Sequence, residues 1–314
     1  MERVRRYRFE VRDHCVMCGS PGEGHRVLGR RLDRPQGRRP GRVSGVTTTV
    51  KRCSDCGLIY SDPQPIPFDI QDHYGVVPEN YWRPEYFTVP KDHLSEQIAL
   101  ARRLLGDRPG MRALDIGAGI GKDMVSLERA GFEVHGLEPS APFHQRGVER
   151  MGLDPARFKL AMVEEVEYPH DHFDLISFGV VLEHIYDPAA ALERTLRWLR
   201  PGGVIRVSVP SSDWLVNRMA NRYYAAIGSG LVANLSPMHT PYHLHEFSLR
   251  SFQAHGARHG HEVAFHQYFV CKTFLPGWLD RVIKPFMRWT NTGMELNVWL
   301  RKQVDQAPDG RTHP

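Results

Sequence analysis

A carboxylate and three glycines stand close together in the stretch LDIGAGIGKD, residues 114–123. Asp115 comes two positions before Gly117, and Gly119 and Gly121 follow at alternate positions. The apolar run before Asp115 predicts a buried strand, and the amphipathic run after Gly121 predicts a helix. In such a strand-to-helix turn, glycines let the backbone approach a ligand closely, and the helix N-terminus directs N–H groups towards it. The stretch therefore predicts a ligand-binding loop.

The spacing and charge of this loop favour one class of ligand over another. A nicotinamide dinucleotide needs G-x-G-x-x-G to hold its pyrophosphate, whereas here the third glycine comes one position early. A carboxylate at Asp115 would repel a phosphate, but it attracts the ammonium and sulfonium groups of S-adenosylmethionine. Glu138 ends the second predicted strand in GLEPS, where an acid can accept the ribose hydroxyls of either nucleoside. We therefore expect a nucleoside site whose charge favours S-adenosylmethionine.

Alternating helices and short apolar strands from about residue 90 must position this loop. Helical spacing is found in DHLSEQIALARRLL, DMVSLERAG and AALERTLRWLRPGG, and strand-like runs are RALDIG, EVHGLE, FDLISFGVVL and VIRVSVP. This βαβ alternation predicts an α/β fold with a doubly wound parallel sheet. Two later β-like runs, EVAFHQYFV and MELNVWLRK, flank a basic aromatic segment.

The motifs LDIGAGIG, GLEPS, FDLISFGVVLEHIYDP and LRPGGVIRVSVP, in this order and spacing, resemble class I S-adenosylmethionine-dependent methyltransferases over residues 90–303. The resemblance implies a Rossmann-like sheet of seven strands whose last pair is antiparallel, supplied by the two late runs. The acid that this family often places after the third strand falls at Met162, so only stacking and backbone contacts to adenine are expected there. The cofactor residues implied by the resemblance are Asp115, Gly117, Ala118, Gly119, Gly121, Glu138, Pro139, Met162 and Phe178.

Four of the five cysteines form two similar knuckles, Cys15-Val-Met-Cys18-Gly and Cys53-Ser-Asp-Cys56-Gly. Two C-x-x-C turns supply four thiolates for a tetrahedral zinc ion, and such a closed site is structural. The expected cytoplasmic setting disfavours disulfides, and the duplication disfavours a redox motif. A zinc ribbon before this core resembles deoxysugar C-methyltransferases and related natural-product methyltransferases, although 314 residues leave no room for the sugar enzymes' further C-terminal domain.

Three histidines in MHTPYHLHEFS are the candidates for a general base, because this type of side chain titrates near neutral pH. His239, His243 and His245 follow the segment that covers the acceptor pocket in this fold. The resemblance to the sugar C-methyltransferases places their histidine at His243 and puts Tyr242 where those enzymes carry a glutamate. His243 is therefore the first candidate, and a hydrogen-bonding role in the lid is the alternative. His184 in LEHIYDP is expected near the pocket in a structural role.

The motifs divide the chain into a zinc ribbon (1–65), an aromatic linker that packs beside or closes over the cofactor (66–89), a methyltransferase domain (90–305) and a disordered tail (306–314). Within the domain, residues 211–245 are expected to form a lid over the acceptor. Core packing is preferred to a membrane-surface position for GWLDRVIKPFMRW, residues 277–289, because Pro285 interrupts the helix. No apolar run is long enough to span a membrane, so a cytoplasmic protein is expected.

The leading hypothesis is methyl transfer from S-adenosylmethionine to oxygen or carbon of a small-molecule acceptor, such as a sugar or natural-product intermediate. The net charge of +5 and the arginine-rich stretch between Arg26 and Arg42 leave an RNA methyltransferase as an alternative. No aromatic residue interleaves those arginines to stack bases. A non-catalytic ribbon protein that assembles a complex is the third possibility. The oligomeric state stays open.

Overall fold

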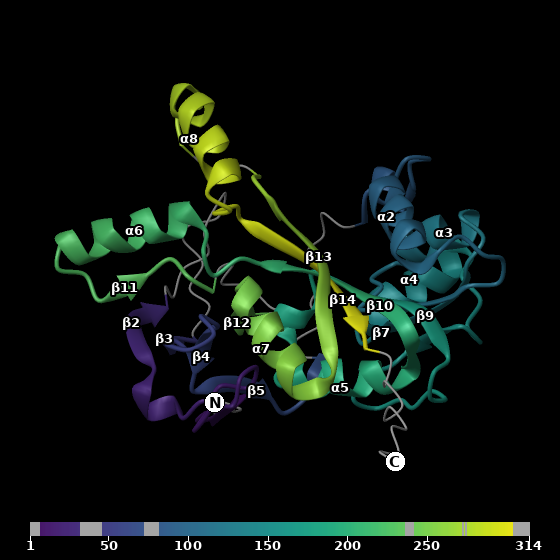
Figure 1. The fold of residues 1–314 in the computed structure, drawn as a ribbon, viewed down its shortest axis with the longest axis horizontal. Helices are drawn as coiled ribbons and strands as arrows, with labels where there is room; N and C mark the ends of the chain where they lie inside the picture. The colour runs from purple at the N-terminus through teal and green to yellow at the C-terminus, as the bar shows by residue number, and fades with distance from the viewer. Residues whose placement is uncertain are drawn as a thin grey trace, which may run out of the picture.

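The computed structural model describes residues 7–31, 46–71, 82–235, 242–271, 273 and 275–303. Its largest sheet has seven strands in the order β13-β14-β10-β9-β6-β7-β8. The long strands β13 and β14 at one edge of this sheet are labelled in Figure 1. The parallel strands are β6 (Arg112–Ile116), β7 (Glu133–Glu138), β8 (Phe158–Leu160), β9 (Phe173–Gly179) and β10 (Leu199–Pro210). β14 (Glu295–Lys302) runs antiparallel to β10 and to β13 (His261–Phe269). The predicted Rossmann-like sheet with an antiparallel final pair is confirmed.

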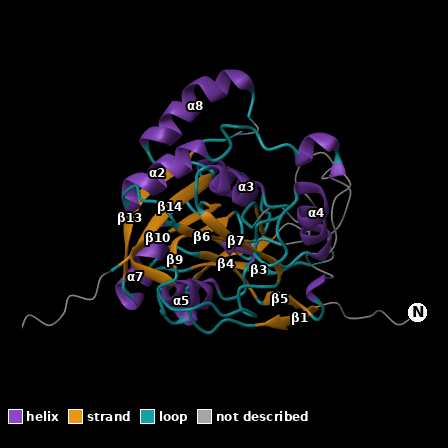
Figure 2. Ribbon diagram, turned by 90° about the vertical axis from the view of Figure 1, so that its right-hand side faces the viewer, coloured by secondary structure: helices purple, strands orange, loops and turns teal. Residues whose placement is uncertain are grey.

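Helices cover both faces of this sheet, as Figure 2 shows. One face carries α2 (Ser95–Leu105), α3 (Lys122–Arg129) and α4 (Ala141–Met151), and the other carries α5 (Pro188–Trp198) and α7 (Leu249–His259). Alternate residues of β6 point to opposite faces of the sheet and pack against different helices. Ala113 packs in the cluster with α2 and α3, whereas Leu114 and Ile116 pack in the cluster with α5 and α7. The period of two in the strands therefore builds a core on each face.

Capping residues determine where two of these helices begin. Asp187 is the N-cap of α5, and its side chain accepts a hydrogen bond from the backbone N–H of Ala190, with Pro188 at the first helical position. α7 begins with a capping box, in which the side chains of Ser248 and Ser251 each accept from the other residue's backbone N–H. Ser248 Oγ also donates to the carbonyl oxygen of Cys56, 2.5 Å away, which ties the helix to the second cysteine knuckle.

A second sheet joins the predicted ribbon to the 211–245 segment. Its five strands lie in the order β11-β2-β3-β4-β12. The three central strands come from the ribbon, β2 (Arg26–Arg31), β3 (Thr49–Arg52) and β4 (Ile59–Asp62). The two outer strands are β11 (Leu231–Val232), after α6 (Leu215–Ala226), and β12 (His245–Glu246). A separate pair is formed by β1 (Tyr7–Glu10) and β5 (Gln64–Pro67). The domain boundaries stay predictions, but strands from both segments share one hydrogen-bonded layer.

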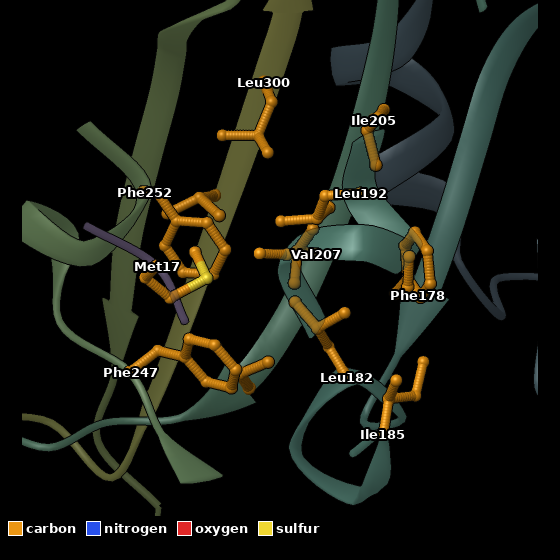
Figure 3. Close-up of a cluster of buried hydrophobic side chains, with 14 of the residues drawn as sticks. Met17, Phe178, Leu182, Ile185, Leu192, Ile205, Val207, Phe247, Phe252 and Leu300 are labelled. Carbon is orange, nitrogen blue, oxygen red and sulfur yellow. The ribbon is translucent and has the colours of Figure 1, made fainter. Parts of the chain in front are cut away.

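The ribbon also shares the hydrophobic core of the methyltransferase sheet. Met17, between the first two cysteines, is fully buried in the same cluster as Phe247, Phe252 and Leu300. Figure 3 shows the Met17 side chain beside the rings of Phe247 and Phe252. Because a buried methionine side chain removes apolar surface from water on both partners, this contact stabilises the two parts together. The ribbon is therefore packed on the sheet.

The expectation of core packing for residues 277–289 is wrong for one face of that segment. α8 (Gly277–Trp289) continues through Pro285 and projects from the body in Figure 1. Trp278, Val282 and Trp289 are 70%, 70% and 80% exposed, whereas Met287 is fully buried. Pro285 is itself exposed, so its ring does not fill the core, and it deprives the helix of one backbone N–H. Within the described residues, no helix is long and apolar enough to cross a membrane.

Candidate functional site

The three glycines of the predicted loop have different surroundings. A Cβ on Gly117 would lie 2.4 Å from Cγ2 of Val181, and a Cβ on Gly121 would lie 2.2 Å from Cδ1 of Leu153. Gly119, with φ +61°, has no described atom within 4 Å of its Cβ position. The first and third glycines are therefore required by packing within the protein. The middle glycine faces open space at the carboxyl ends of the strands, which is where ligands bind in open α/β sheets.

Glu138 connects the end of β7 to this loop. The backbone N–H of Gly119 donates to its Oε2 and that of Ser140 to its Oε1, both at 2.7 Å. Burial raises the pKa of Glu138 to about 7, although the two N–H groups oppose this shift. Each carboxylate oxygen has a second lone pair that can accept from a hydroxyl. A nucleoside ribose beside Gly119 therefore fits the group that Glu138 presents.

Asp115 belongs to a row of polar side chains across the sheet. Strand register pairs Asp115 with Ser177 and Ser177 with Arg206, so all three lie on the same face. Arg206 Nη1 donates to Ser177 Oγ at 3.2 Å and to Asp123 Oδ2 at 3.3 Å, and His93 Nε2 lies 2.8 Å from Asp123 Oδ1. Burial and then Asp123 hold the pKa of Asp115 well above its usual range, and Arg206 opposes them. Sequence reasoning missed Arg206, whose only signal was a charge inside VIRVSVP.

The other predicted cofactor residues lie around the same edge in different environments. Ala118 donates its N–H to the carbonyl of Leu137, 2.9 Å away, which closes the loop onto β7. The carbonyl oxygen of half-buried Pro139 accepts a hydrogen bond from Gln71 Nε2 at 2.8 Å. No sequence pattern indicated this contact with the linker. Met162 is half-buried beyond β8, and Phe178 is fully buried in the core cluster. These four assignments stay predictions.

The described part of the aromatic linker packs against cations on α3 and α4. It contains the short helix η3 (Pro84–Phe87). Three cations lie over aromatic rings of the linker. Lys122 Nζ is 4.2 Å from the ring centroid of Tyr86. Arg146 Cζ is 3.7 Å from that of Trp82, and Arg150 Cζ is 4.6 Å from that of Phe87. Tyr74 and Tyr81 lie outside the described residues. Cation–π attraction of this kind fixes the linker beside the glycine loop.

Two of the three predicted catalytic histidines lie in described parts of the chain, whereas His239 lies outside them. His245 is fully buried, with its Nε2 3.0 Å from Gln64 Nε2. Arg12 donates to Gln64 Oε1 and so orients this amide, which leaves the Gln64 nitrogen as the donor and His245 Nε2 as the acceptor. Burial lowers the pKa of His245 to about 3. A neutral imidazole therefore joins β12 to the ribbon.

His243 lies beside a glutamate and a second histidine. Glu183, His184 and His243 form what we call the inner cluster, in which one ligand atom of each side chain lies within 4.8 Å of the others. The ring centroids of the two histidines are 4.8 Å apart. Glu183 and His184 belong to η4 (Leu182–His184), which follows β9. Burial raises the pKa of Glu183, which is fully buried, to about 8. Sequence reasoning singled out both histidines but missed Glu183, although it stands next to His184.

A second group of the same residue types lies on α5 and α7. Glu193, His255 and His259 form what we call the outer cluster. His259 Nε2 lies 3.4 Å from Glu193 Oε1, and the Glu193 side chain is 42% exposed. His255 Nδ1 lies 2.8 Å from Nε2 of His261. The carboxylate of the outer cluster is therefore both solvated and paired.

The four knuckle cysteines converge on one point. Their sulfur atoms all lie within 4.8 Å of one another, with Cys15 Sγ 3.5 Å from Cys56 Sγ and Cys18 Sγ 3.5 Å from Cys53 Sγ. Sulfur atoms around a zinc ion with bonds of about 2.3 Å are separated by about 3.8 Å, so the donors fit a tetrahedral ion. Ser20 Oγ lies 3.1 Å and 3.2 Å from the sulfurs of Cys18 and Cys53. The cluster therefore has the donor set and shape of a closed structural site.

Comparison with known proteins agrees with this geometry. The model of a family described as "Methyltransferase domain" matches residues 91–264, which is more than half of the chain, so the chain belongs to this family. A ubiquinone biosynthesis O-methyltransferase of Bradyrhizobium diazoefficiens is 33% identical over 111 residues, covering 33% of this chain and 42% of that protein. A trans-aconitate 2-methyltransferase of Deinococcus radiodurans is 28% identical over 171 residues, covering 51% of this chain and 65% of that protein.

The chain spans about half the length of the first curated relatives, 42% and 52% of two Bradyrhizobium enzymes. Among solved structures, an S-adenosylmethionine dependent methyltransferase from Mesorhizobium loti is 17% identical with a TM-score of 0.47, covering 68% of this chain and all of that one. The family match confirms the predicted class of fold and domain: the chain contains a methyltransferase domain over residues 91–264.

Proposed function

We propose that the protein transfers the methyl group of S-adenosylmethionine to an oxygen or carbon of a small-molecule acceptor. The observation that carries this proposal is the contact between Gly117 and Val181. Val181 immediately precedes η4, so the contact brings the inner cluster next to the glycine loop. A cofactor at Gly119 and an acceptor at His243 would then be neighbours, as an in-line displacement requires. The names of the curated relatives, which concern ubiquinone and trans-aconitate, support a small-molecule acceptor.

Each group at the site has a proposed role. Glu138 would accept the ribose hydroxyls, and the row that contains Asp115 and Arg206 would set the charge at the methionine end. When bound, the cofactor supplies a methyl group on a positively charged sulfur. His243 is the proposed base for the acceptor proton, and His184 holds the lid through Nδ1, which lies 3.0 Å from the carbonyl oxygen of Tyr242.

We also propose that the four cysteines bind a structural zinc ion whose effect reaches the acceptor side of the site. β4 follows the second knuckle and pairs with β12, which begins two residues after His243. Fully buried Glu246, in β12, accepts from the N–H of Leu235 and from Asn234 Nδ2, both at 2.6 Å. The zinc site would therefore hold the strand that positions His243.

Arg26 and Arg30 in β2 are exposed, whereas a third arginine of this strand is not available to RNA. Arg31 is fully buried against the ring of Tyr242, with the guanidinium carbon 5.2 Å from the ring centroid. Burial lowers the pKa of Arg31 to about 10. This arginine therefore stabilises the sheet and is not available to a phosphate. Methyl transfer to RNA but to no small molecule would overturn the acceptor class proposed here.

A calorimetric titration with S-adenosylmethionine tests the cofactor site. Gly119→Ala should weaken binding by at least about tenfold, because the new Cβ enters the open space at the loop and strains a left-handed residue by about 1–2 kcal/mol. Gly131→Ala is the matched control, because Gly131 also has a positive φ of +86° and open surroundings but lies at the opposite end of α3. Equal loss of affinity in both variants, or no binding by the folded parent, would contradict the proposed site.

A further inference from the structure

The inner cluster contains a carboxylate that the protein does not satisfy. Glu183 is 0% exposed, and neither of its side-chain oxygens has a hydrogen-bond partner among the described residues. A buried carboxylate is stable only when it is protonated, hydrogen-bonded or paired with a cation. The nearest ring nitrogen in an ion-pair contact, His184 Nε2, lies 4.0 Å from Glu183 Oε1, too far for a hydrogen bond. The gap between these groups indicates a ligand that bonds to both.

The tautomer of His184 suits a metal ligand. Its Nδ1 lies 3.0 Å from the carbonyl oxygen of Tyr242. A carbonyl oxygen only accepts hydrogen bonds, so Nδ1 carries the hydrogen and Nε2 carries a lone pair directed towards the cluster. Metal-binding histidines are usually oriented in this way, by donating their second ring nitrogen to a carbonyl or carboxylate.

The cluster is buried but reachable. The side chain of His184 is 13% exposed and His243 is 9% exposed, so the two histidines lie between fully buried Glu183 and the surface. Val180, which begins the turn to η4, has a φ of +60°, a conformation that is rare for a β-branched residue. Such outliers persist where the surrounding structure holds them, often at functional sites. The turn that presents Glu183 and His184 is therefore strained.

We propose that Glu183, His184 and His243 bind a divalent first-row metal ion, and that this ion holds an acceptor through two adjacent oxygen atoms. Two imidazoles and one carboxylate suit Mn²⁺, Fe²⁺ or Zn²⁺. Three protein ligands leave coordination positions open for the acceptor, which we expect to be a vicinal diol, a catechol or a hydroxy acid. This inference rests on the proposed methyl transfer for its role, but the ion binds independently of it.

The ion changes how the acceptor hydroxyl loses its proton. A hydroxyl bound to a divalent ion loses its proton to water more easily, because the ion stabilises the negative oxygen. That oxygen then bonds to the methyl carbon as the carbon–sulfur bond breaks, and the positively charged sulfonium becomes a neutral thioether. With the ion bound, His243 acts as a ligand and no longer as the base for the acceptor proton, which water accepts instead. The products are the methyl ether, S-adenosylhomocysteine and the proton released to water, so atoms and charge balance.

A manganese titration of the zinc-loaded protein tests the site. The electron paramagnetic resonance signal of free Mn²⁺ measures binding, and Mn²⁺ prefers oxygen and nitrogen ligands, so the thiolates keep their zinc. We expect one ion per chain. Glu183→Gln should weaken binding by at least about 100-fold, because a neutral amide is a poor ligand for the ion. His243→Ala tests the second segment of the site if the first variant folds poorly. Glu193→Gln is the matched control from the outer cluster and should bind as the parent does.

Two outcomes overturn the inference: no Mn²⁺ binding by the folded parent, or binding that survives in both Glu183→Gln and His243→Ala, whatever Glu193→Gln shows. A separate calorimetric titration with S-adenosylmethionine distinguishes this failure from failure of the proposed function. Normal cofactor binding, with methyl transfer that persists after chelation, would overturn the metal site alone. Normal Mn²⁺ binding without cofactor binding would overturn the methyl-transfer proposal alone.

Discussion

The four-cysteine cluster and the inner cluster gather metal-type ligands in different ways. The cysteines come from two knuckles of the same design, in which the glycine after each pair returns its N–H to the first cysteine's carbonyl, at 2.7 Å and 3.1 Å. Four sulfur donors complete a tetrahedron and leave no position for a substrate. The inner cluster takes three ligands from η4 and from a segment about 60 residues later, beside the glycine loop. A closed set of ligands stabilises a fold, whereas an open set can bind an acceptor.

The largest effect on stability should come from removing one ligand of the four-cysteine cluster. Cys53→Ser removes one of four thiolates, and because metal binding at structural sites is coupled to folding, we expect a loss of several kcal/mol. For a domain of this size that corresponds to a fall in Tm of about 10 °C. Cys271→Ser, which changes a cysteine outside the cluster, should leave Tm and zinc content unchanged. Thermal denaturation with metal analysis measures both, and a fully zinc-loaded Cys53→Ser protein of parental Tm would contradict the closed structural site.

The open site should affect the reaction more than the fold. With an acceptor identified by screening, Glu183→Gln should lower kcat by about 100-fold while the Kd for S-adenosylmethionine changes little, because an interaction with the acceptor is removed and the cofactor site is intact. Steady-state production of S-adenosylhomocysteine measures this. The control, Glu193→Gln, should retain the parental rate. If kcat falls equally in both variants, the contrast between the inner and outer clusters has no functional meaning.

We expect the free energy of unfolding to depend on pH through His255 of the outer cluster and its neighbour His261. Burial, and then nearby histidines, lower the pKa of His255 to about 3 and that of His261 to about 4. Both pKa values lie below the usual value of about 6.5, so the unfolded chain binds protons at a higher pH than the folded chain does. The stability of the folded state is therefore full above about pH 6.5 and decreases as the pH falls. The free energy of unfolding should fall by about 1 kcal/mol per pH unit for each histidine.

Denaturant titrations from neutral to acidic pH test this sign. His261→Asn should show a shallower loss of stability on acidification than the parent, because one titrating group is removed. Gln267→Asn, in the same strand β13, serves as a control that leaves the titration unchanged. Parallel pH profiles for the parent and His261→Asn would show that these buried histidines do not govern acid lability.

The smallest effect should come from the ion pair of the outer cluster. His259 and Glu193 are 22% and 42% exposed at the side chain, and pairs of this kind contribute at most about 0.5–1 kcal/mol. Glu193→Gln should therefore change the free energy of unfolding by no more than about 0.5 kcal/mol in a denaturant titration. A change of several kcal/mol would mean that the outer cluster contributes as much to the free energy of unfolding as the four-cysteine cluster does.

Local periodicity predicted much of the fold. Apolar runs such as RALDIG and EVHGLE became β6 and β7, and EVAFHQYFV and MELNVWLRK became the antiparallel pair β13 and β14. The knuckle cysteines were predicted together because two C-x-x-C turns carry their own geometry. In contrast, α8 was assigned to the core because Pro285 was given more weight than the surrounding helical pattern, and burial on one face depends on partners that a local pattern does not contain.

The sequence by itself determined the βαβ order, the glycine turn and the four thiols, because hydrophobic period, glycine conformation and C-x-x-C spacing act over a few residues. Only the tertiary structure decided that Arg206 lies in one row with Ser177 and Asp115, that β12 extends the ribbon sheet, and that Glu183 is buried without a partner among the described residues. These features depend on burial and on contacts between distant segments. A glutamate next to a histidine has the same letters in η4 or in a solvated loop, and only the surrounding fold sets its charge and its ligands.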